Sequence, residues 1–342
     1  MIRSVTPGDL WRLRGKARNQ VVFYDDTLLV QPHQPVWFAF RCFIAGNGRD
    51  RITTVYQERG VRAYVQAQGR SGRPEQDIIY ASVLGGGSKT RRSDRDIWYR
   101  LLEHTVIEAG NHHVERLYAA IWNQQDEMRE VFRQLGFQPY VRRYVLQLSG
   151  PDWDQGTRLA VMRTQSRRDS WAIHKLYGSV TPHVVQGHEM RTPRTWSLSV
   201  SQQWLQPRRQ GWVLGADDDL EAYLHALSGP RAHVLTPLIV PAARESLPEI
   251  LRFGLAQLHD DKPVYLLIAE YQSELLALAQ NLGFQPIGEQ TLLLKQTAVP
   301  ARRLVLRPTF EPEPGLEPRV TVPSITVPRE DTHAYVRTTA ND

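Results

Sequence analysis

A run of glycines followed by cations, residues 85–92, is the part of this sequence best suited to hold a phosphate group. It reads Gly85-Gly86-Gly87-Ser88-Lys89-Thr90-Arg91-Arg92. Glycine lets an anion approach the main-chain N–H groups closely, and the three cations add positive charge. The run is not a P-loop, because Ser88 stands where a glycine must precede the lysine. It is not a dinucleotide fingerprint either, because Thr90 takes the place of the third glycine.

The helix expected after this run offers a competing interpretation. Ser93 and Asp96 have the spacing of an N-terminal capping pair, and Asp94 places a second carboxylate in the first turn. Such carboxylates stand where an anion would otherwise be held by the positive end of the helix. A solvated surface turn before a capped helix therefore remains the alternative to a phosphate site.

Other chemical constellations are weaker. His112 and His113 are adjacent in an extended segment, so their side chains should point apart, and we expect no metal site. The single cysteine, Cys42, lies among apolar residues and is expected to be buried and inert. His183 and His188 are expected in a loop, either lining a substrate cleft or simply solvated. The sequence contains no Gly-x-Ser-x-Gly or Cys-x-x-Cys motif.

Net charge and apolar runs indicate whether nucleic acid or a membrane is an expected partner. The net charge of +6 is spread over the chain without a basic cluster, so nucleic acid is not an expected partner. The longest apolar run, residues 36–45, is too short for a membrane span and contains Arg41. The N-terminus lacks the apolar segment of a secretory signal. We therefore expect a cytoplasmic protein that is not bound to a membrane.

The elements that would position these residues alternate between strands and helices. In the first half, apolar patterns predict strands at 2–5, 51–56, 61–68, 77–84, 114–122 and 140–148, and helices from 7, at 98–109 and at 126–135. In the second half they predict strands at 159–162, 212–215, 222–227, 233–240, 264–270 and 288–295, and helices at 170–177, 247–258 and 273–282. This order is typical of an α/β protein with a mixed sheet.

One five-residue segment occurs twice. Leu-Gly-Phe-Gln-Pro begins at Leu135 and again at Leu282, about 147 residues later, each time after a predicted helix and before a predicted strand. Gly136 and Gly283 are expected to end these helices in the left-handed conformation. The repeat predicts that one design was used twice.

The repeat also predicts the domain boundaries. We expect domains at 1–149 and 157–298, joined by the turn-rich residues 149–156. From 300 to 342 the chain is rich in proline and has no helical or alternating period, which predicts a disordered tail.

The order of elements, the Val-Pro-x-x-Arg turn at 240–244 and the repeated Leu-Gly-Phe closure resemble the GNAT (Gcn5-related N-acetyltransferase) superfamily, in a tandem arrangement. The resemblance covers roughly residues 1–298. It implies two tandem GNAT-like domains, each a mixed sheet flanked by helices. The activity it implies is acyl-CoA-dependent transfer, with acetyl-CoA as a substrate, to a small-molecule or peptide amine, without a metal.

In this superfamily a Gln/Arg-x-x-Gly-x-Gly/Ala loop receives the pyrophosphate of acetyl-CoA. Val240 and Arg244 match the start of this loop in the second half, but Leu247 and Glu249 occupy the glycine positions. Ser246-x-x-Glu249 is also a predicted capping box, and Pro248 removes one donor. The resemblance therefore favours CoA binding in the first half, with the pyrophosphate near 86–88 and the acyl group beside Val83.

The superfamily's usual general acid is a tyrosine three residues before the Leu of Leu-Gly-Phe. Phe132 and Ala279 stand there in this chain, and neither can donate a proton. Asn123 matches an asparagine frequent in the superfamily, although a structural role in a turn is an equal alternative. The resemblance thus leaves two functions open: an N-acyltransferase with eroded CoA loops, or a non-catalytic GNAT-like protein that binds a ligand or partner.

The proline-rich tail leads to a prediction about thermal stability. Deletion of the chain after Arg307 should leave the melting temperature nearly unchanged, because a segment without apolar periodicity contributes little to a core. Amide hydrogens from about Glu311 onward should exchange rapidly with solvent. Thermal unfolding of the full and shortened chains tests this, and a large drop in melting temperature would show that the tail packs as part of the fold.

Overall fold

The computed structural model describes residues 1–58, 61–85, 93–149, 160–198, 207–216, 218–258 and 260–297. Residues 1–300 form one compact unit. The predicted linker beyond residue 149, the glycine run from 86 to 92 and the predicted tail all lie outside the described residues. The predicted domain boundaries and the disorder of the tail therefore remain predictions.

The first half of the chain alternates strands and helices as expected. Its strands are β1 (Ile2–Ser4), β2 (Ala17–Val22), β3 (Arg51–Glu58), β4 (Val61–Gly69), β5 (Glu75–Leu84), β6 (Arg116–Trp122) and β7 (Gln138–Leu148). Its helices are α1 (Pro7–Arg12), α2 (Asp26–Val30), α3 (Pro35–Ala45), α4 (Asp94–Asn111) and α5 (Asp126–Gln134).

The second half follows a similar order, without a counterpart of β2 in its described residues. Its strands are β8 (Arg163–Thr164), β9 (Arg208–Ala216), β10 (Asp219–Ser228), β11 (His233–Ile239), β12 (Val264–Ala269) and β13 (Gln285–Gln296). Its α-helices are α6 (Asp169–Val180), α7 (His183–Glu189), α8 (Leu247–Ala256) and α9 (Leu275–Asn281), and its 3-10 helices are η1 (Pro193–Trp196), η2 (Pro241–Ser246) and η3 (Glu270–Gln272).

All the strands join one mixed sheet, which confirms the α/β class. The order across it is β1-β3-β4-β5-β6-β13-β7-β12-β11-β10-β9-β8, with β2 paired to β5 outside this path. In the first half, one face of the sheet packs on α4 and α5, and the other face packs on α1 and α3. In the second half, α8 and α9 cover one face and α6 covers the other.

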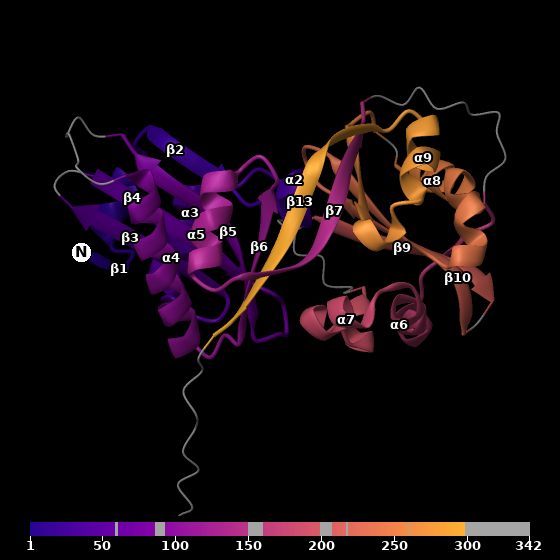
Figure 1. Ribbon diagram of the computed structural model, residues 1–342, viewed down its shortest axis with the longest axis horizontal. Coiled ribbons are helices and arrows are strands. Elements are labelled where there is room, and N and C mark those ends of the chain that lie inside the picture. The colour runs from indigo at the N-terminus through magenta and orange to yellow at the C-terminus, as the bar shows by residue number, and fades with distance from the viewer. Residues whose placement is uncertain are drawn as a thin grey trace, which may run out of the picture. The chain divides into compact units, whose positions relative to one another are not determined.

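The two halves exchange their closing strands. β7, which ends the first half, pairs antiparallel with β12 of the second half, and β13 pairs antiparallel with β6 of the first. The two exchanged strands also pair with each other, and Figure 1 shows them side by side through the middle of the sheet. Gly136 (φ 80°) and Gly283 (φ 93°) adopt the predicted left-handed conformation just before these strands.

The exchanged strands also place side chains in the hydrophobic core of the opposite half. Leu293 of β13 packs in the core formed by α4 and α5 of the first half. Leu146 of β7 packs in the core formed by α8 and α9 of the second half. Each half therefore buries a side chain that the other half supplies.

Several details differ from the sequence predictions. The predicted opening strand at 159–162 is replaced by the two-residue β8, because Ala160 and Met162 pack into a core without strand pairing in the described region. His183 and His188 lie on the short helix α7 rather than in a loop, because Pro182 precedes a run that can form helical bonds. Strand β2 was not predicted. Cys42 is buried on α3, as expected.

The exchange predicts cooperative unfolding. Leu146→Ala and Leu293→Ala should each reduce the free energy of unfolding by about 2–5 kcal/mol, because each leaves a cavity in a packed core. Both variants should shift a single unfolding transition, because β7 and β13 each pair with a strand of the opposite half. Ile287→Ala, at an exposed position on β13, should cost less than about 0.5 kcal/mol. Urea unfolding followed by fluorescence and circular dichroism tests this, and two separate transitions, each shifted by one variant, would contradict it.

Candidate functional site

Each half contains a pair of parallel strands that separate. β5 and β6 pair only from Glu75↔Arg116 to Asp77↔Tyr118, and β11 and β12 pair only from His233↔Val264 to Leu235↔Leu266. Beyond these three pairs the strands diverge toward their carboxyl ends. In open α/β sheets, ligands bind outside the carboxyl ends of parallel strands, so we treat these two divergences, called here the first and second splits, as candidate sites.

The first split is filled by the chain itself. Strand β2 pairs antiparallel with β5 on the edge that β6 has left, from Ala17↔Leu84 to Val22↔Tyr80. The pairing continues at both ends, where the Phe23 N–H donates to the Ile79 carbonyl (3.0 Å) and the Gly85 N–H donates to the Lys16 carbonyl (2.9 Å). A ligand on this edge would have to displace a whole strand.

The residues predicted to hold CoA in the first half meet this strand. Val83 pairs with Asn19 of β2 on one side and with Ala63 of β4 on the other. Phe132, at the position of the missing general acid, is fully buried with its ring 5.4 Å from that of Phe23. Gly86, Gly87, Ser88, Lys89, Arg91 and Arg92 lie outside the described residues. A phosphate site there therefore remains a prediction.

The start of α4 is capped as predicted. The Ser93 Oγ accepts a hydrogen bond from the Asp96 N–H at 3.2 Å. Asp94 pairs with Arg18 and accepts a hydrogen bond from the Asn19 side chain at 3.2 Å. Both of these partners belong to β2, so the same strand that fills the first split also holds the first turn of α4.

The second split has no such strand among the described residues. On its edge, the Ile239 carbonyl accepts a hydrogen bond from the buried Gln272 side chain, with Nε2 at 3.2 Å. The Thr236 Oγ1 is buried and has no hydrogen-bond partner in the described part of the chain. Among the described residues, a side chain rather than a strand thus hydrogen-bonds to the edge of β11.

The loop after β11 differs from its prediction. Ser246 makes no side-chain cap, so the predicted capping box with Glu249 is wrong. The reason is that η2 runs directly into α8 and gives Ser246 a helical conformation (φ −79°, ψ −2°). The helical segment instead begins at Pro241, after Val240. Arg244 lies in η2, and its Nε is 2.6 Å from the Glu274 Oε1.

Asn123 has a structural role in this fold. Its Nδ2 donates to the Glu289 carboxylate (2.8 Å), and its Oδ1 accepts from the Thr291 hydroxyl (2.8 Å). Both partners are on β13, so the Asn123 side chain hydrogen-bonds the exchanged strand to the end of β6. Ala279, the second position of the missing general acid, is fully buried.

A set of charged and aromatic side chains comes from α2, α6, β7, β10 and residues 189–191. We call it the Arg191 cluster, and its members are Asp26, Arg143, Tyr177, Glu189, Arg191 and His225. Arg191 Nε lies 2.7 Å from Glu189 Oε2, and the guanidinium lies 5.4 Å from the ring centre of Tyr177. The Tyr177 hydroxyl donates to Glu189 at 2.8 Å. About a third of the Arg191 side chain (36%) remains exposed.

The first half holds the segment that carries Arg191. The Tyr118 hydroxyl of β6 donates to the His188 carbonyl at 2.9 Å. Arg73 donates to the carbonyls of Glu189 and Met190, the latter at 3.2 Å. Met190 itself has a left-handed backbone (φ 43°). The position of Arg191 is thus fixed by contacts from the other half of the chain.

The opposite side of the cluster is Asp26 on α2. Arg143 of β7 reaches its Oδ1 at 2.6 Å and also donates to the Tyr24 carbonyl at 3.1 Å. The Asp26 side chain is 43% exposed. Desolvation opposes ionisation of Asp26, but the charge and hydrogen bond of Arg143 hold its pKa below the ordinary value. Asp26 is therefore a carboxylate at neutral pH.

His225 is the neutral member of the cluster. Burial, with a contribution from Arg209, lowers the pKa of His225 to about 4. His225 pairs with Thr236 across β10 and β11, which places it beside the separated part of β11. A neutral imidazole can accept a proton or a hydrogen bond.

The sequence analysis did not find this cluster. Its members come from α2, β7, α6, β10 and the end of α7, and no short motif connects them. Only His188, singled out as a residue that could line a cleft, lies nearby on α7. The exchange of β7 and the packing of α2 against β10 and β11 bring these distant segments together.

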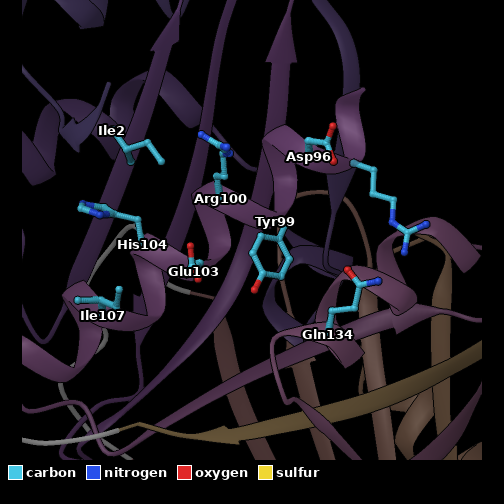
Figure 2. A pocket seen from close by; sticks show the side chains of 9 residues that line it. Ile2, Asp96, Tyr99, Arg100, Glu103, His104, Ile107 and Gln134 are labelled. Atoms are coloured by element: carbon cyan, nitrogen blue, oxygen red, sulfur yellow. The ribbon is translucent and has the colours of Figure 1, made fainter. Parts of the chain in front are cut away.

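A separate hollow of about 730 Å³ runs along one side of α4, as Figure 2 shows. Its lining residues come from β1, α4 and α5, and Tyr99, Arg100 and Glu103 lie at its centre. None of its lining residues belongs to the separated strands of either split. It is therefore not part of the candidate site.

Among the described residues, no three His, Cys, Asp or Glu side chains are grouped so that they could hold a metal ion. No helix in that part of the chain is long and apolar enough to cross a membrane.

The depressed pKa of His225 predicts a pH dependence of stability. The unfolded imidazole binds a proton near pH 6.5, whereas the folded one stays neutral until about pH 4. The contribution of the neutral His225 side chain to the free energy of unfolding is fully present above pH 6.5 and is lost as the pH falls toward 4. Between pH 7 and pH 5, the free energy of unfolding of the unaltered protein should therefore fall by on the order of 1–2 kcal/mol more than that of the His225→Gln variant. Urea titrations at both pH values measure this, with His183→Gln, at an exposed site, as the control. Equal losses in His225→Gln and in the unaltered protein would contradict it.

Comparison with known proteins was made by family, by sequence and by structure. No protein-family model and no curated protein sequence matches the chain. A tandem GNAT protein from the clavulanic acid biosynthesis pathway is 15% identical, with 73% of this chain and 84% of that one covered and a TM-score of 0.42. A GCN5-related N-acetyltransferase from Sphaerobacter thermophilus is 12% identical, with 88% and 96% covered and a TM-score of 0.46. A putative acetyltransferase from Pyrococcus horikoshii is 12% identical, with 88% and 91% covered and a TM-score of 0.42. Each of these three solved structures is described as a GNAT protein or an acetyltransferase.

Proposed function

We propose that the protein is a GNAT-like N-acyltransferase that binds acyl-CoA at the second split, between β11 and β12. One observation supports this choice most strongly: β2 pairs with the edge of β5 in the first half, whereas in the described part of the chain the Gln272 side chain hydrogen-bonds to the edge of β11. Acyl-CoA would lie along β11, with its pyrophosphate at the start of η2 beside Val240 and Arg244.

The energetic difference between the two splits is large. At the second split a ligand replaces one hydrogen bond from Gln272, which is worth about 0.5–1.5 kcal/mol net. At the first split it would have to break the pairing of six residues of β2 and expose the buried ring of Phe23. Burial of an aromatic side chain alone contributes about 1.5–3 kcal/mol. By this comparison, a ligand would break fewer backbone hydrogen bonds at the second split than at the first.

The proposed reaction is nucleophilic attack on a thioester. The neutral amine nitrogen attacks the thioester carbonyl carbon, the new C–N bond forms, and the C–S bond breaks. The leaving CoA thiolate takes up the proton that the amine loses, which gives an amide and free CoA. Tyr271, two residues after β12, can relay this proton: its hydroxyl gives a proton to the thiolate and regains one from the amine, and burial raises its pKa so that it is protonated at neutral pH.

The second candidate is a non-catalytic GNAT-like binding protein. It is favoured by the η2 segment, where Leu247 is fully buried at a position that is glycine in the superfamily's pyrophosphate loop. Glycine there lets a phosphate approach the main chain closely. Acetyl-CoA affinity therefore separates the two candidates.

Two matched arginines allow a test of which split binds. Arg244 in η2 pairs with Glu274 just before α9, and Arg95 in the first turn of α4 pairs with Glu130 on α5 (3.5 Å). Calorimetric titration with acetyl-CoA should show binding that Arg244→Ala weakens by about 5–10-fold, the range for a charge-assisted contact of roughly 1–1.4 kcal/mol. Arg95→Ala should leave the affinity within about twofold.

Other outcomes assign the function differently. Loss of affinity in Arg95→Ala, or in a triple alanine variant of Lys89, Arg91 and Arg92, with no change in Arg244→Ala would place CoA in the first half. A protein that does not bind acetyl-CoA at all would favour the non-catalytic candidate.

A further inference from the structure

We infer that the outer face of α3, together with the exposed side chains of α1 beside it, is a docking surface for an anionic lipid membrane. The protein would lie on such a membrane without crossing it. The inference is independent of the proposed acyltransferase function, since none of the residues that carry it belongs to the strands of either split.

Helix α3 is apolar on both its inner and its outer face. The inner face, which includes Phe38 and Cys42, is buried in a core of the first half. At about 3.6 residues per turn, Trp37, Phe40 and Ile44 share the opposite face. Trp37 and Ile44 are 51% and 68% exposed, and the rings of Trp37 and Phe40 stack with their centres 5.2 Å apart. A helix that is apolar all round is normally buried on all sides, so the outer face of α3 lacks the cover that its composition calls for.

Helix α1 adds to this exposed apolar surface. It contacts α3, and its Leu10 packs against the same core. Trp11 of α1 is 75% exposed, and Phe43 on the flank of α3 is 42% exposed. Among the described residues eleven large apolar side chains are exposed, and four of them are on these two short helices. Apolar side chains gathered in this way, rather than scattered singly, mark an interaction surface.

Exposed cations lie among these apolar side chains. Arg41, four residues after Trp37, is exposed on the outer face of α3. The Arg14 guanidinium lies 5.0 Å from the ring centre of Trp11. Arg12 and Lys16, on either side of Arg14, are exposed as well. The surface is therefore both apolar and positively charged.

The same segments carry almost no negative charge. Residues 10–24 and 27–49 contain no Asp or Glu. Asp9 of α1 is only 2% exposed, and both of its carboxylate oxygens accept hydrogen bonds from Arg3. The partner that complements this surface is therefore anionic as well as apolar.

An anionic membrane has both properties. Its head groups attract arginine and lysine, and tryptophan, phenylalanine and isoleucine reach the apolar layer beneath them. Nucleic acid would pair with the cations but offers no apolar layer to Ile44. A second copy of the chain, packed about a twofold axis, would bring the like charges of these cations together. A lipid surface is thus the occupant that the observations favour.

The short length of the apolar run does not oppose this inference. Residues 36–45 are too few to span a membrane, which is the ground for expecting no membrane partner from the sequence. A helix that lies in the plane of the interface need not span the hydrocarbon layer. The same residues therefore suit binding to the surface of a membrane.

Co-sedimentation of the full chain with lipid vesicles tests the inference. Vesicles of phosphatidylcholine and phosphatidylserine in equal parts should sediment the protein at low salt, whereas vesicles of phosphatidylcholine alone should not. Added salt should weaken binding, because it screens the head-group charges. The double variant Trp37→Ser with Ile44→Ser should weaken binding by at least about tenfold, and Arg41→Gln by about fivefold.

Two matched controls lie elsewhere on the chain. Trp171 on α6 is 63% exposed, and Trp171→Ser should leave vesicle binding within about twofold. Arg194→Gln, at another exposed position, should do the same. All these variants replace side chains that are exposed, so their melting temperatures should stay close to that of the unaltered protein.

Other outcomes would overturn the inference. One is equal binding to both kinds of vesicle, and another is binding that Trp37→Ser with Ile44→Ser leaves unchanged. A third is a dimer that this double variant converts to a monomer, with no binding to vesicles, since a second copy would then cover the face. Binding of single-stranded RNA that Arg41→Gln weakens, again without vesicle binding, would assign the face to nucleic acid instead.

Discussion

The pairing of β7 with β13 is the constraint on which the rest of the structure depends. Each strand lies between two others, so its two rows of backbone hydrogen bonds are completed by both halves of the chain. If one half were removed, β6 or β12 would be left with an unpaired edge, and unpaired edges promote non-specific pairing with other chains. The duplicated halves are therefore not two independent domains placed side by side. Each completes the sheet and the core of the other.

Because the halves are interdependent, they can specialise. The first half uses the segment after α1 to fill its own split with β2, and the chain then continues into α2, which packs against the second half. This packing is tight: the Arg231 N–H donates to the Val30 carbonyl at 3.0 Å, and a Cβ on Gly229 would lie 2.5 Å from the same oxygen. The segment that closes the first split thus continues directly into the helix that carries Asp26.

The sequence predicted the repeating unit but not how the units combine. Leu-Gly-Phe followed by an apolar strand has the same local pattern whether the strand returns to its own half or crosses to the other, so β7 and β13 were predicted as strands without their partners. Strand β2 escaped prediction because Ala17–Val22 includes Arg18, Asn19 and Gln20, and its place is decided by the edge of β5 that β6 leaves free. The Ser93 cap was predicted correctly, whereas the Ser246 cap was not, because local spacing cannot reveal that η2 extends α8 backward.

One buried carboxylate connects the first half of the sheet to the segment that carries Arg191. Glu75, 1% exposed, begins the short parallel pairing of β5 with β6 and accepts hydrogen bonds from Arg73 (2.7 Å) and Arg116 (2.9 Å). A buried carboxylate is tolerated only when such partners compensate its desolvation, so both arginines are held in fixed positions. Arg73 then donates to the backbone of residues 189 and 190, immediately before Arg191. The backbone of residues 189 and 190 in the second half is therefore connected, through Arg73, to an ion pair at the base of the first split.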